Sequence, residues 1–454
     1  MDSNVNIGLL NISPIDGRYK KKTRDLNTFF SEYGLIKYRL MIEIKYLILL
    51  INILKLEVSN KEHEKINNII YKFNYNEANK IKEYEKKCNH DVKAIEYYIR
   101  EKLNEFKLEH LNCYIHYGLT SQDINNMAIT YSINDFITSF YYKKLTIIID
   151  NINKLSSKWY NIIMICKTHG QPAVPSTLGK EFKVFSYRLE KQFTILQDIK
   201  YYGKFGGAIG NLNAHYFSYP NINWDEEFDK FVSSFGLIRE QYTTQIDNYE
   251  NLAVVFDCLR RINTILIDFN RDIWSYISIN YFDQKFDINE VGSSTMPQKI
   301  NPINFENSEG NLMIANNLLD FMSNKLPVSR FQRDLTDSTV LRNVGTIFGH
   351  IFISFDNLLT GLNKIVPNEQ IIQNDCHNNY SVLSEGLQTI LRKNNIENGY
   401  EIIKKYFRNN SIINKEKFEE IINDLVNTLN IKEEDKLKLK NLSHYNYIGN
   451  VNKK

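Results

Sequence analysis

Between Pro14 and Pro172 the chain contains no proline, and this absence constrains its fold more than any other feature. Proline is the commonest helix breaker, because it lacks the backbone N–H that a helix needs and its ring clashes with the preceding turn. Only eight prolines occur among the 454 residues. The sequence therefore favours long helices.

Hydrophobic periodicity supports this interpretation. Along residues 252–276 apolar side chains recur in steps of three and four, as in the seam of a helix within a bundle. The same period appears in residues 29–54 and 128–159, whereas no sustained period-two alternation bounded by hairpin signals occurs. We predict an all-α chain. The seam consists of Leu252, Val255, Leu259, Ile262, Leu266, Phe269, Ile273 and Tyr276.

The length predicts about three domains of roughly 150 residues, or one elongated bundle with two appendages. Changes in pattern place boundaries near residues 114 and 365. We therefore expect an N-terminal helical domain over 1–114, a central helix bundle over 115–365 and a C-terminal helical domain over 366–454.

Composition excludes several classes of protein. A formal net charge of +3 is too small to indicate nucleic-acid binding. The five cysteines are scattered without a C-x-x-C pair, so neither a disulfide framework nor a zinc site is expected, and a reducing cytoplasm fits best. The apolar run 46–54 is too short to span a membrane, and no targeting segment is evident.

The segment 291–310, VGSSTMPQKINPINFENSEG, is typical of a catalytic loop. Ser293 and Ser294 follow a glycine, and two prolines stiffen a turn that also presents Lys299 and Asn301. Reactive side chains usually lie on loops held by a rigid scaffold, and this loop combines a potential nucleophile or base with a cation. The alternative is a Ser/Thr-rich surface linker.

Two further junctions carry candidate residues. Thr120 and Asp123 in TSQD have the spacing of a capping box and mark the start of a helix. His169 lies in THGQPAVPST, which we interpret as a loop between two helices, and its imidazole suits proton transfer near neutral pH. The alternative is a structural histidine that bonds the loop backbone.

His90 begins a predicted helix beside Asp91, whose carboxylate could orient or charge the imidazole. Simple helix capping is the alternative. We reject a catalytic metal, because the nine histidines include no H-x-x-x-H or comparable pair. The glycines of residues 203–211 have the wrong spacing for a nucleotide-binding motif and indicate a tight turn.

The segment 329–343, SRFQRDLTDSTVLRN, places Arg333, Ser338 and Arg342 near one helical start. Guanidinium groups bind phosphate or carboxylate in a bidentate manner, and a helix N-terminus adds donors of its own. The segment therefore predicts an oxyanion site. A solvated charged helix with Arg–Asp pairs is the alternative.

Several of these motifs together resemble a known family. GSSTMPQKINP, THGQP, TSQDINN and NHDVKAIEY resemble signature segments of the fumarase/aspartase superfamily. SPIDGRY, YTTQI, NFENSEG and LPVSRFQRDLTDSTVLRN are similar to those of bacterial-type adenylosuccinate lyases, and the resemblance spans nearly the whole chain. It implies a helical three-domain subunit with a central bundle, and a homotetramer whose active sites are shared between subunits.

The resemblance also implies roles. Ser293 would remove the proton beside the succinyl carboxylate and His169 would protonate the departing nitrogen, which releases fumarate from adenylosuccinate or from its imidazole carboxamide analogue SAICAR without a cofactor. Gln298 departs from the usual motif at a variable position, and the part beyond about residue 365 matches least distinctively. The implied substrate-binding residues are Arg18, Tyr19, Asn89, His90, Asp91, Thr120, Ser121, Gln245, Ser294, Lys299, Ile300, Asn301, Asn307, Arg333, Ser338, Thr339, Val340, Leu341 and Arg342.

Two rival functions remain at this point. An argininosuccinate lyase would keep Ser293 and His169 but would need no phosphate clamp, which the arginines of 329–343 argue against. A non-enzymatic helical scaffold would leave the proline-framed serine loop without a purpose. The sequence does not distinguish a preference for adenylosuccinate from one for SAICAR.

Overall fold

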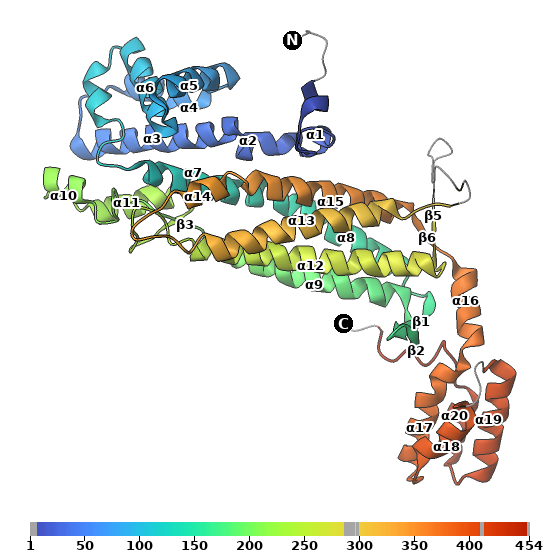
Figure 1. Cartoon of the computed structure of the whole chain (residues 1–454). Helices are drawn as coiled ribbons and strands as arrows, with labels where there is room; N and C mark the ends of the chain where they lie inside the picture. Colours follow the sequence, from blue (N-terminus) through green and yellow to red (C-terminus); the bar gives the residue numbers. More distant parts are fainter. Residues whose placement is uncertain (1–6, 286–295, 297–298, 409–412, 452–454) are drawn as a thin grey trace. The chain divides into compact units, whose positions relative to one another are not determined.

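The computed structural model describes residues 7–285, 296, 299–408 and 413–451 (Figure 1). These residues fall into two compact units, each built from three separate stretches of chain. The first unit comprises residues 1–146, 191–267 and 307–356, and the second comprises 147–190, 268–306 and 357–454. Each unit is described by itself below.

The chain is predominantly helical, as its sequence predicts. The helix predicted over 252–276 is α12, Glu250–Ser278, and its seam from Leu252 to Ile273 is almost completely buried. The elements before α8 are η1 (Ile7–Leu10), α1 (Lys20–Thr23), η2 (Arg24–Leu26), α2 (Asn27–Phe30), α3 (Glu32–Leu54), α4 (Asn60–Tyr71), α5 (Tyr75–Cys88), α6 (Asp91–Glu105), η3 (Glu109–Tyr114), α7 (Ser121–Phe136) and the π-helical η4 (Ile137–Tyr141).

The remaining elements follow in chain order. They are α8 (Tyr142–Lys158), β1 (Ile163–Thr168), β2 (Gln171–Thr177), α9 (Leu178–Asp198), β3 (Tyr202–Gly203), α10 (Asn213–Ser218), α11 (Trp224–Ser233), β4 (Ile238–Arg239), α12, β5 (Phe282–Gln284), α13 (Ile303–Lys325), α14 (Thr336–Leu341), α15 (Val344–Lys364), β6 (Ile365–Pro367), α16 (Glu369–Asn378), η5 (Tyr380–Leu383), α17 (Ser384–Lys393), α18 (Gly399–Phe407), α19 (Lys415–Thr428) and α20 (Glu433–Lys440).

The N-terminal helices of the first unit share one hydrophobic core. Helix α3 packs against α4, α5 and α6, and each of the latter three begins at a side chain that caps it: Ser59, Asn74 and His90. Such caps satisfy the free N–H groups of the first turn. The core includes Leu40, Ile44, Leu47, Ile66, Ile69, Ile81, Ile95 and Ile99.

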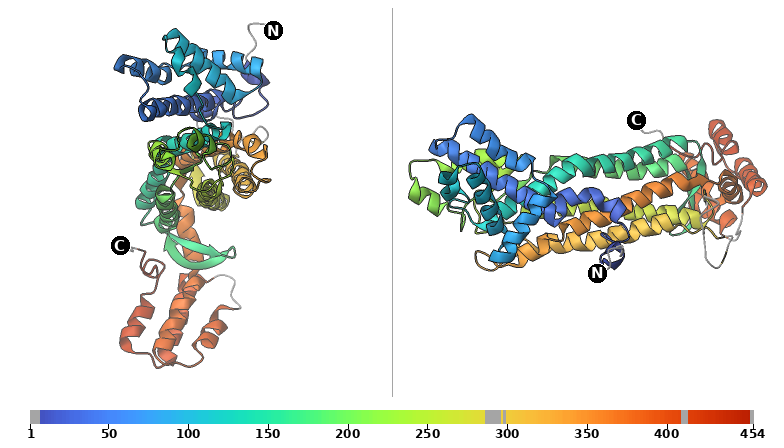
Figure 2. Two further views of the ribbon diagram at one scale, coloured as in Figure 1. Left: turned by 90° about the vertical axis from the view of Figure 1, so that its left-hand side faces the viewer. Right: turned by 90° about the horizontal axis from the view of Figure 1, so that it is seen from above.

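The other layer of the first unit contains α7 and parts of α12, α13 and α15, which run side by side (Figures 1 and 2). Polar contacts reinforce this packing in its interior. The Asn263 amide of α12 donates to Asn316 of α13 at 3.0 Å, and Ser308 and Ser354 share a 2.7 Å hydrogen bond between α13 and α15. These hydrogen bonds join α12 to α13 and α13 to α15 within the first unit.

The second unit contains a feature that the sequence interpretation missed. Around His169 the sequence predicts a loop between two helices, whereas β1 and β2 form an antiparallel hairpin there, with Thr168 paired to Gln171. His169 and Gly170 are the two turn residues, and both have positive φ, at 53° and 73°. A two-residue hairpin loop of this kind requires left-handed backbone at both positions, and His-Gly is a weaker signal than Asn-Gly.

Helices α16 to α20 of the second unit enclose their own core. Apolar residues of η5, α17 and α19, among them Leu383, Leu387 and Phe418, pack together with Ile165 of β1. Strands β5 and β6 pair antiparallel, from Phe282 opposite Pro367 to Gln284 opposite Ile365. The hairpin that bears His169 is therefore tied to the C-terminal helices.

Candidate active site

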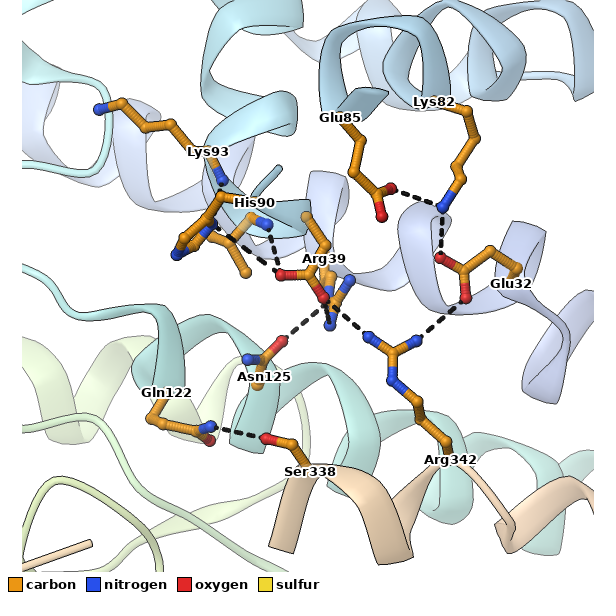
Figure 3. Close-up of polar contacts among 12 residues, drawn as sticks. Glu32, Arg39, Lys82, Glu85, His90, Lys93, Gln122, Asn125, Ser338 and Arg342 are labelled. Atoms are coloured by element: carbon orange, nitrogen blue, oxygen red, sulfur yellow. Dashed lines mark hydrogen bonds and ion pairs between the residues drawn. The ribbon is translucent and has the colours of Figure 1, made fainter. Parts of the chain in front are cut away.

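A cavity of about 520 Å³ lies in the first unit, between the N-terminal helices and the layer that contains α7 and α14 (Figure 3). Its lining comes from α3, from the junction of α5 and α6, from the start of α7 and from residues 333–342. The polar residues that line it are Arg39, Glu85, Asn89, His90, Asp91, Ser121, Gln122, Asn125, Arg333, Ser338, Thr339 and Arg342.

Asp91 is the centre of charge in this cavity. Its Oδ2 accepts from Arg39 at 2.8 Å and from Arg342 at 2.9 Å, although these arginines are far apart in sequence. Burial opposes the charged form of Asp91, but the Arg39 and Arg342 charges and the Val92 N–H outweigh it and lower the pKa of the carboxyl. Asp91 is therefore ionised and paired.

His90 takes the role that the sequence left as its alternative. It is the N-cap of α6, and its Nδ1 accepts from the Lys93 N–H at 3.1 Å, whereas its distance to Asp91 Oδ1 is 4.0 Å. Asn89 precedes it in the left-handed conformation that ends α5. Both residues line the cavity, so capping and a place at the site coexist.

The start of α7 is fixed by a buried ion pair. Thr120 and Asp123 form the predicted capping box, with the Thr120 N–H donating to Asp123 Oδ2 at 2.8 Å. The other oxygen of Asp123 accepts from Lys204 Nζ at 2.6 Å and from the N–H groups of Gly206 and Gly207. The glycine-rich turn thus holds Ser121 at the cavity wall.

We expect Lys204→Met to lower the free energy of unfolding by about 3–5 kcal/mol, the typical cost of removing one partner of a buried pair. Both side chains of the pair are fully buried, so water cannot replace the lost cation. Urea denaturation measures the change. The matched control is Lys204→Met with Asp123→Asn, and a double variant no more stable than the single one contradicts the prediction.

Several residues of the segment 333–342, for which the sequence predicts an oxyanion site, line this cavity. Ser338, Thr339, Leu341 and Arg342 line the cavity, but Val340 is buried and is not part of the lining. Ser338 accepts from Gln122 of α7 at 3.2 Å. Helix α14 has only six residues, and Arg342 is its C-cap, so this arginine lies at the end of the helix and not near its start as the sequence predicts.

A buried network joins α7, the 245–249 loop and α14. The Tyr249 hydroxyl donates to Asp337 Oδ2 at 2.9 Å and accepts from the Asn126 amide at 2.8 Å. Nearby, Arg333 donates to the Gln245 side chain at 3.0 Å. Gln245 therefore contacts a residue of the cavity, although it does not itself line it.

Three predicted residues form a separate group in the same unit. The Tyr19 hydroxyl accepts from Asn307 at 3.3 Å, and Arg18 lies over the Tyr19 ring, 5.8 Å from its centroid. The Asn307 hydrogen bond lowers the pKa of Tyr19. None of the three is among the residues that line the cavity beside Arg342.

The remaining candidates belong to the second unit or lie outside the described residues. His169 is exposed at the tip of the β1–β2 hairpin. Lys299 begins a described stretch in which its N–H donates to the Met296 carbonyl, and the Ile300 carbonyl accepts from Gln284. Asn301 is partly buried. Ser293 and Ser294 lie outside the described residues.

Sequence reasoning missed four of the polar residues that line the cavity: Arg39, Glu85, Gln122 and Asn125. A signal for the first existed, because Arg39 and Glu43 fall within the apolar stripe of α3, between Ile36 and Leu47, where charged residues need buried partners. Gln122 and Asn125 stand beside the predicted cap but carry no distinctive spacing. Gln122 and Asn125 line the cavity only because tertiary packing brings other segments, such as α14, against this face of α7.

Within the described ranges, no group of three His, Cys, Asp or Glu side chains is arranged to hold a metal ion. Across the same residues, every helix is too short or too polar to cross a membrane.

Comparisons with known proteins cover nearly the whole chain. Residues 17–316 match a family model described as "Lyase", and residues 329–448 match one described as "Adenylosuccinate lyase C-terminal". The chain is 47% identical over 463 residues to an adenylosuccinate lyase of Dictyostelium discoideum, covering 99% of each chain. It is 44% identical to one of Buchnera aphidicola and 42% identical to one of Escherichia coli, covering 96% of each chain in both comparisons.

Solved structures match the fold at low sequence identity. A 3-carboxy-cis,cis-muconate lactonizing enzyme from Pseudomonas putida gives a TM-score of 0.73 at 17% identity and covers 94% of each chain. A fumarate lyase from a Mesorhizobium species gives 0.72 at 15% identity and covers 95% of each chain. These likenesses establish the helical fold alone.

Proposed function

The chain belongs to the adenylosuccinate lyase family, and from this premise we propose how its residues perform the reaction of a carbon–nitrogen lyase. It acts on adenylosuccinate in purine biosynthesis, where elimination of fumarate leaves AMP. The same elimination converts SAICAR to AICAR. The observation that carries this conclusion is the similarity to adenylosuccinate lyases at 41–47% identity along almost the full length of the chain.

Elimination breaks two bonds on adjacent carbon atoms. Ser293, as the base, removes the proton from the carbon beside a succinyl carboxylate, and that electron pair forms the double bond of fumarate as the C–N bond breaks. His169, as the acid, protonates the departing nitrogen. Lys299, Asn301 and loop amides stabilise the negative charge that develops on the carboxylate, and no cofactor takes part.

The cavity of the first unit suits the nucleotide end of the substrate. Arg333, Ser338 and Arg342 supply donors for the phosphate, together with Arg18 and Tyr19. In the shared site of the proposed tetramer, further residues contact the base and the succinyl group, and Asn89, Ile300, Thr339, Val340 and Leu341 complete the proposed substrate-binding set. The residues for the base and succinyl group are His90, Asp91, Thr120, Ser121, Gln245, Ser294 and Asn307.

We expect Arg342→Gln to raise KM for adenylosuccinate about tenfold or more, because a charge-assisted hydrogen bond to phosphate is worth roughly 1.5–3 kcal/mol. Steady-state kinetics measure KM. Arg330→Gln is the matched control, since Arg330 lies in the same segment, is 77% exposed and pairs only with Asp334 among the described residues. An unchanged KM in Arg342→Gln excludes the phosphate role.

The proposed assembly is a homotetramer with shared active sites. Large apolar side chains of the first unit remain exposed along the long helices, including Val254 of α12, and such exposed patches mark association surfaces. In α13, Met313, Ile314 and Phe321 are 46%, 47% and 51% exposed. Light scattering after size exclusion tests the tetramer.

We retain the division into domains 1–114, 115–365 and 366–454, and a cytoplasmic location, as parts of this proposal. The N-terminal core, which extends from Ile36 to Ile115, supports the first boundary. Limited proteolysis tests the division, since cleavage near residues 114 and 365 is expected.

The direct test of the proposed function mixes purified protein with adenylosuccinate and follows the ultraviolet absorbance. A spectral change to that of AMP, with one fumarate per AMP, is expected. Cleavage of argininosuccinate in place of adenylosuccinate would contradict the proposal and favour the rival function, an argininosuccinate lyase.

A further inference from the structure

Arg342 forms ion pairs with two carboxylates, Glu32 and Asp91. Its Nη1 donates to Glu32 Oε2 at 3.2 Å and its Nη2 donates to Asp91 Oδ2 at 2.9 Å (Figure 3). Both terminal amino groups of the guanidinium are thus held by carboxylates. A phosphate that takes the N–H groups directed at Glu32 and Asp91 replaces both carboxylates as partners of the guanidinium.

Each of these carboxylates has a second cation. Asp91 is also bound by Arg39, whose side chain is 3% exposed, and whose Nε donates to Asn125 at 2.8 Å. Because Arg39 is buried and held from two sides, it stays in place when Arg342 moves. Asp91, with a side chain 25% exposed, then keeps a partner at 2.8 Å.

Glu32 has the equivalent arrangement at the surface. Its Oε1 binds Lys82 of α5 at 3.1 Å, and Lys82 also binds Glu85 at 2.6 Å. Glu32 and Lys82 are 42% and 36% exposed, so water shares the charge here more than it does at Asp91. When Arg342 leaves Glu32, Lys82 and water still stabilise the negative charge of the carboxylate.

We propose that Arg39 and Lys82 are positioning residues that allow Arg342 to exchange its two carboxylate partners for the phosphate of the nucleotide. After the exchange each carboxylate keeps one cation, so no anion is stranded in the partly buried site. Leaving a buried charge without its partner is costly, and Arg39 removes that cost from the binding of nucleotide. The proposal rests on the phosphate role of Arg342 in the proposed function.

The sign of the effect follows from the pairs. Without Arg39, Asp91 has Arg342 as its remaining arginine partner, and binding of phosphate to Arg342 leaves the carboxylate without either. Nucleotide binding is then weakened. When Arg342 is absent as well, Asp91 loses its partners in both the free and the bound states, so removal of Arg39 no longer matters for binding.

The experiment is a double-mutant cycle on the full-length enzyme. We expect Arg39→Gln to raise KM for adenylosuccinate about tenfold with kcat within about twofold, and Lys82→Gln to raise KM about twofold, because Lys82 is more exposed. In the Arg342→Gln background, adding Arg39→Gln is expected to change KM by less than about twofold. Arg39→Lys, which keeps the charge on Asp91, is expected to restore most of the affinity.

Controls separate the possible failures. Lys86→Gln, on the same helix as Lys82, breaks an exposed pair with Glu83 and is expected to leave KM unchanged. If Arg342→Gln alone leaves KM unchanged, the proposed function fails at its phosphate site. If Arg342→Gln raises KM but the Arg39→Gln effect persists in full in that background, the exchange proposal is overturned. If Arg39→Gln does not assemble, Lys82→Gln takes its place in the cycle with Arg342→Gln. An effect of Lys82→Gln on KM that is as large with Arg342→Gln as without it then overturns the exchange proposal.

Discussion

Replacement of Ser293 by alanine should leave an assembled protein that turns over adenylosuccinate about 10²–10⁴-fold more slowly, the usual contribution of a general base. The proton beside the succinyl carboxylate is only weakly acidic, so the reaction stalls without a positioned base. KM should change little, because the substrate still meets the arginines of the first unit. Discontinuous assays of AMP and fumarate in quenched samples measure the residual turnover.

Ser278→Ala is the matched control for this variant. Ser278 ends α12, is exposed and donates to the backbone of Ser275, so its loss should leave turnover unchanged. Retention of a tenth or more of normal turnover by Ser293→Ala would exclude the base role.

Replacement of His169 by asparagine should lower kcat about 10²–10³-fold while the hairpin keeps its form. His169 has a φ of 53°, in the left-handed region that asparagine adopts more readily than most residues. The variant therefore removes the acid without straining the turn. Far-ultraviolet circular dichroism and thermal unfolding check the fold, and the fumarate assay measures kcat.

Thr168→Ala, on the adjacent exposed position, controls for local changes in the hairpin and should keep normal turnover. A His169→Asn enzyme with normal kcat would refute the acid role.

A mixture of the Ser293→Ala and His169→Asn proteins adds a test of the shared site. If the two groups of one site come from different subunits, hybrid assemblies contain some sites with both groups, and activity rises above that of either variant.

Helix positions in this chain follow from local sequence. The seam of α12 and the Thr120–Asp123 cap were predicted because periodicity and capping depend on residues three and four apart. The hairpin at His169 was missed for a related reason. Its strands contain Pro172 and Pro175 and lack clear alternation, and they gain their place by pairing with each other and by packing of Ile165 on the C-terminal core.

The candidate site also combines residues that local motifs indicate with contacts that depend on the tertiary fold. Sequence motifs indicated His90, Asp91, Ser338 and Arg342, which the fold brings to one cavity. For His90 the sequence left helix capping and a place at the site as alternatives, because both share one local signal, and the structure shows both.

The sequence by itself determined the helical class, the family of the chain and most of the residues that line its arginine-rich cavity, since each depends on local pattern or on motifs read in order. Only the tertiary structure decided that Arg39 and Arg342 share one oxygen of Asp91, and that Lys204 neutralises Asp123 in the interior. The physical reason is the separation of the partners along the sequence. Such pairs join residues far apart in the chain, and a buried charge is tolerated only where packing delivers its partner.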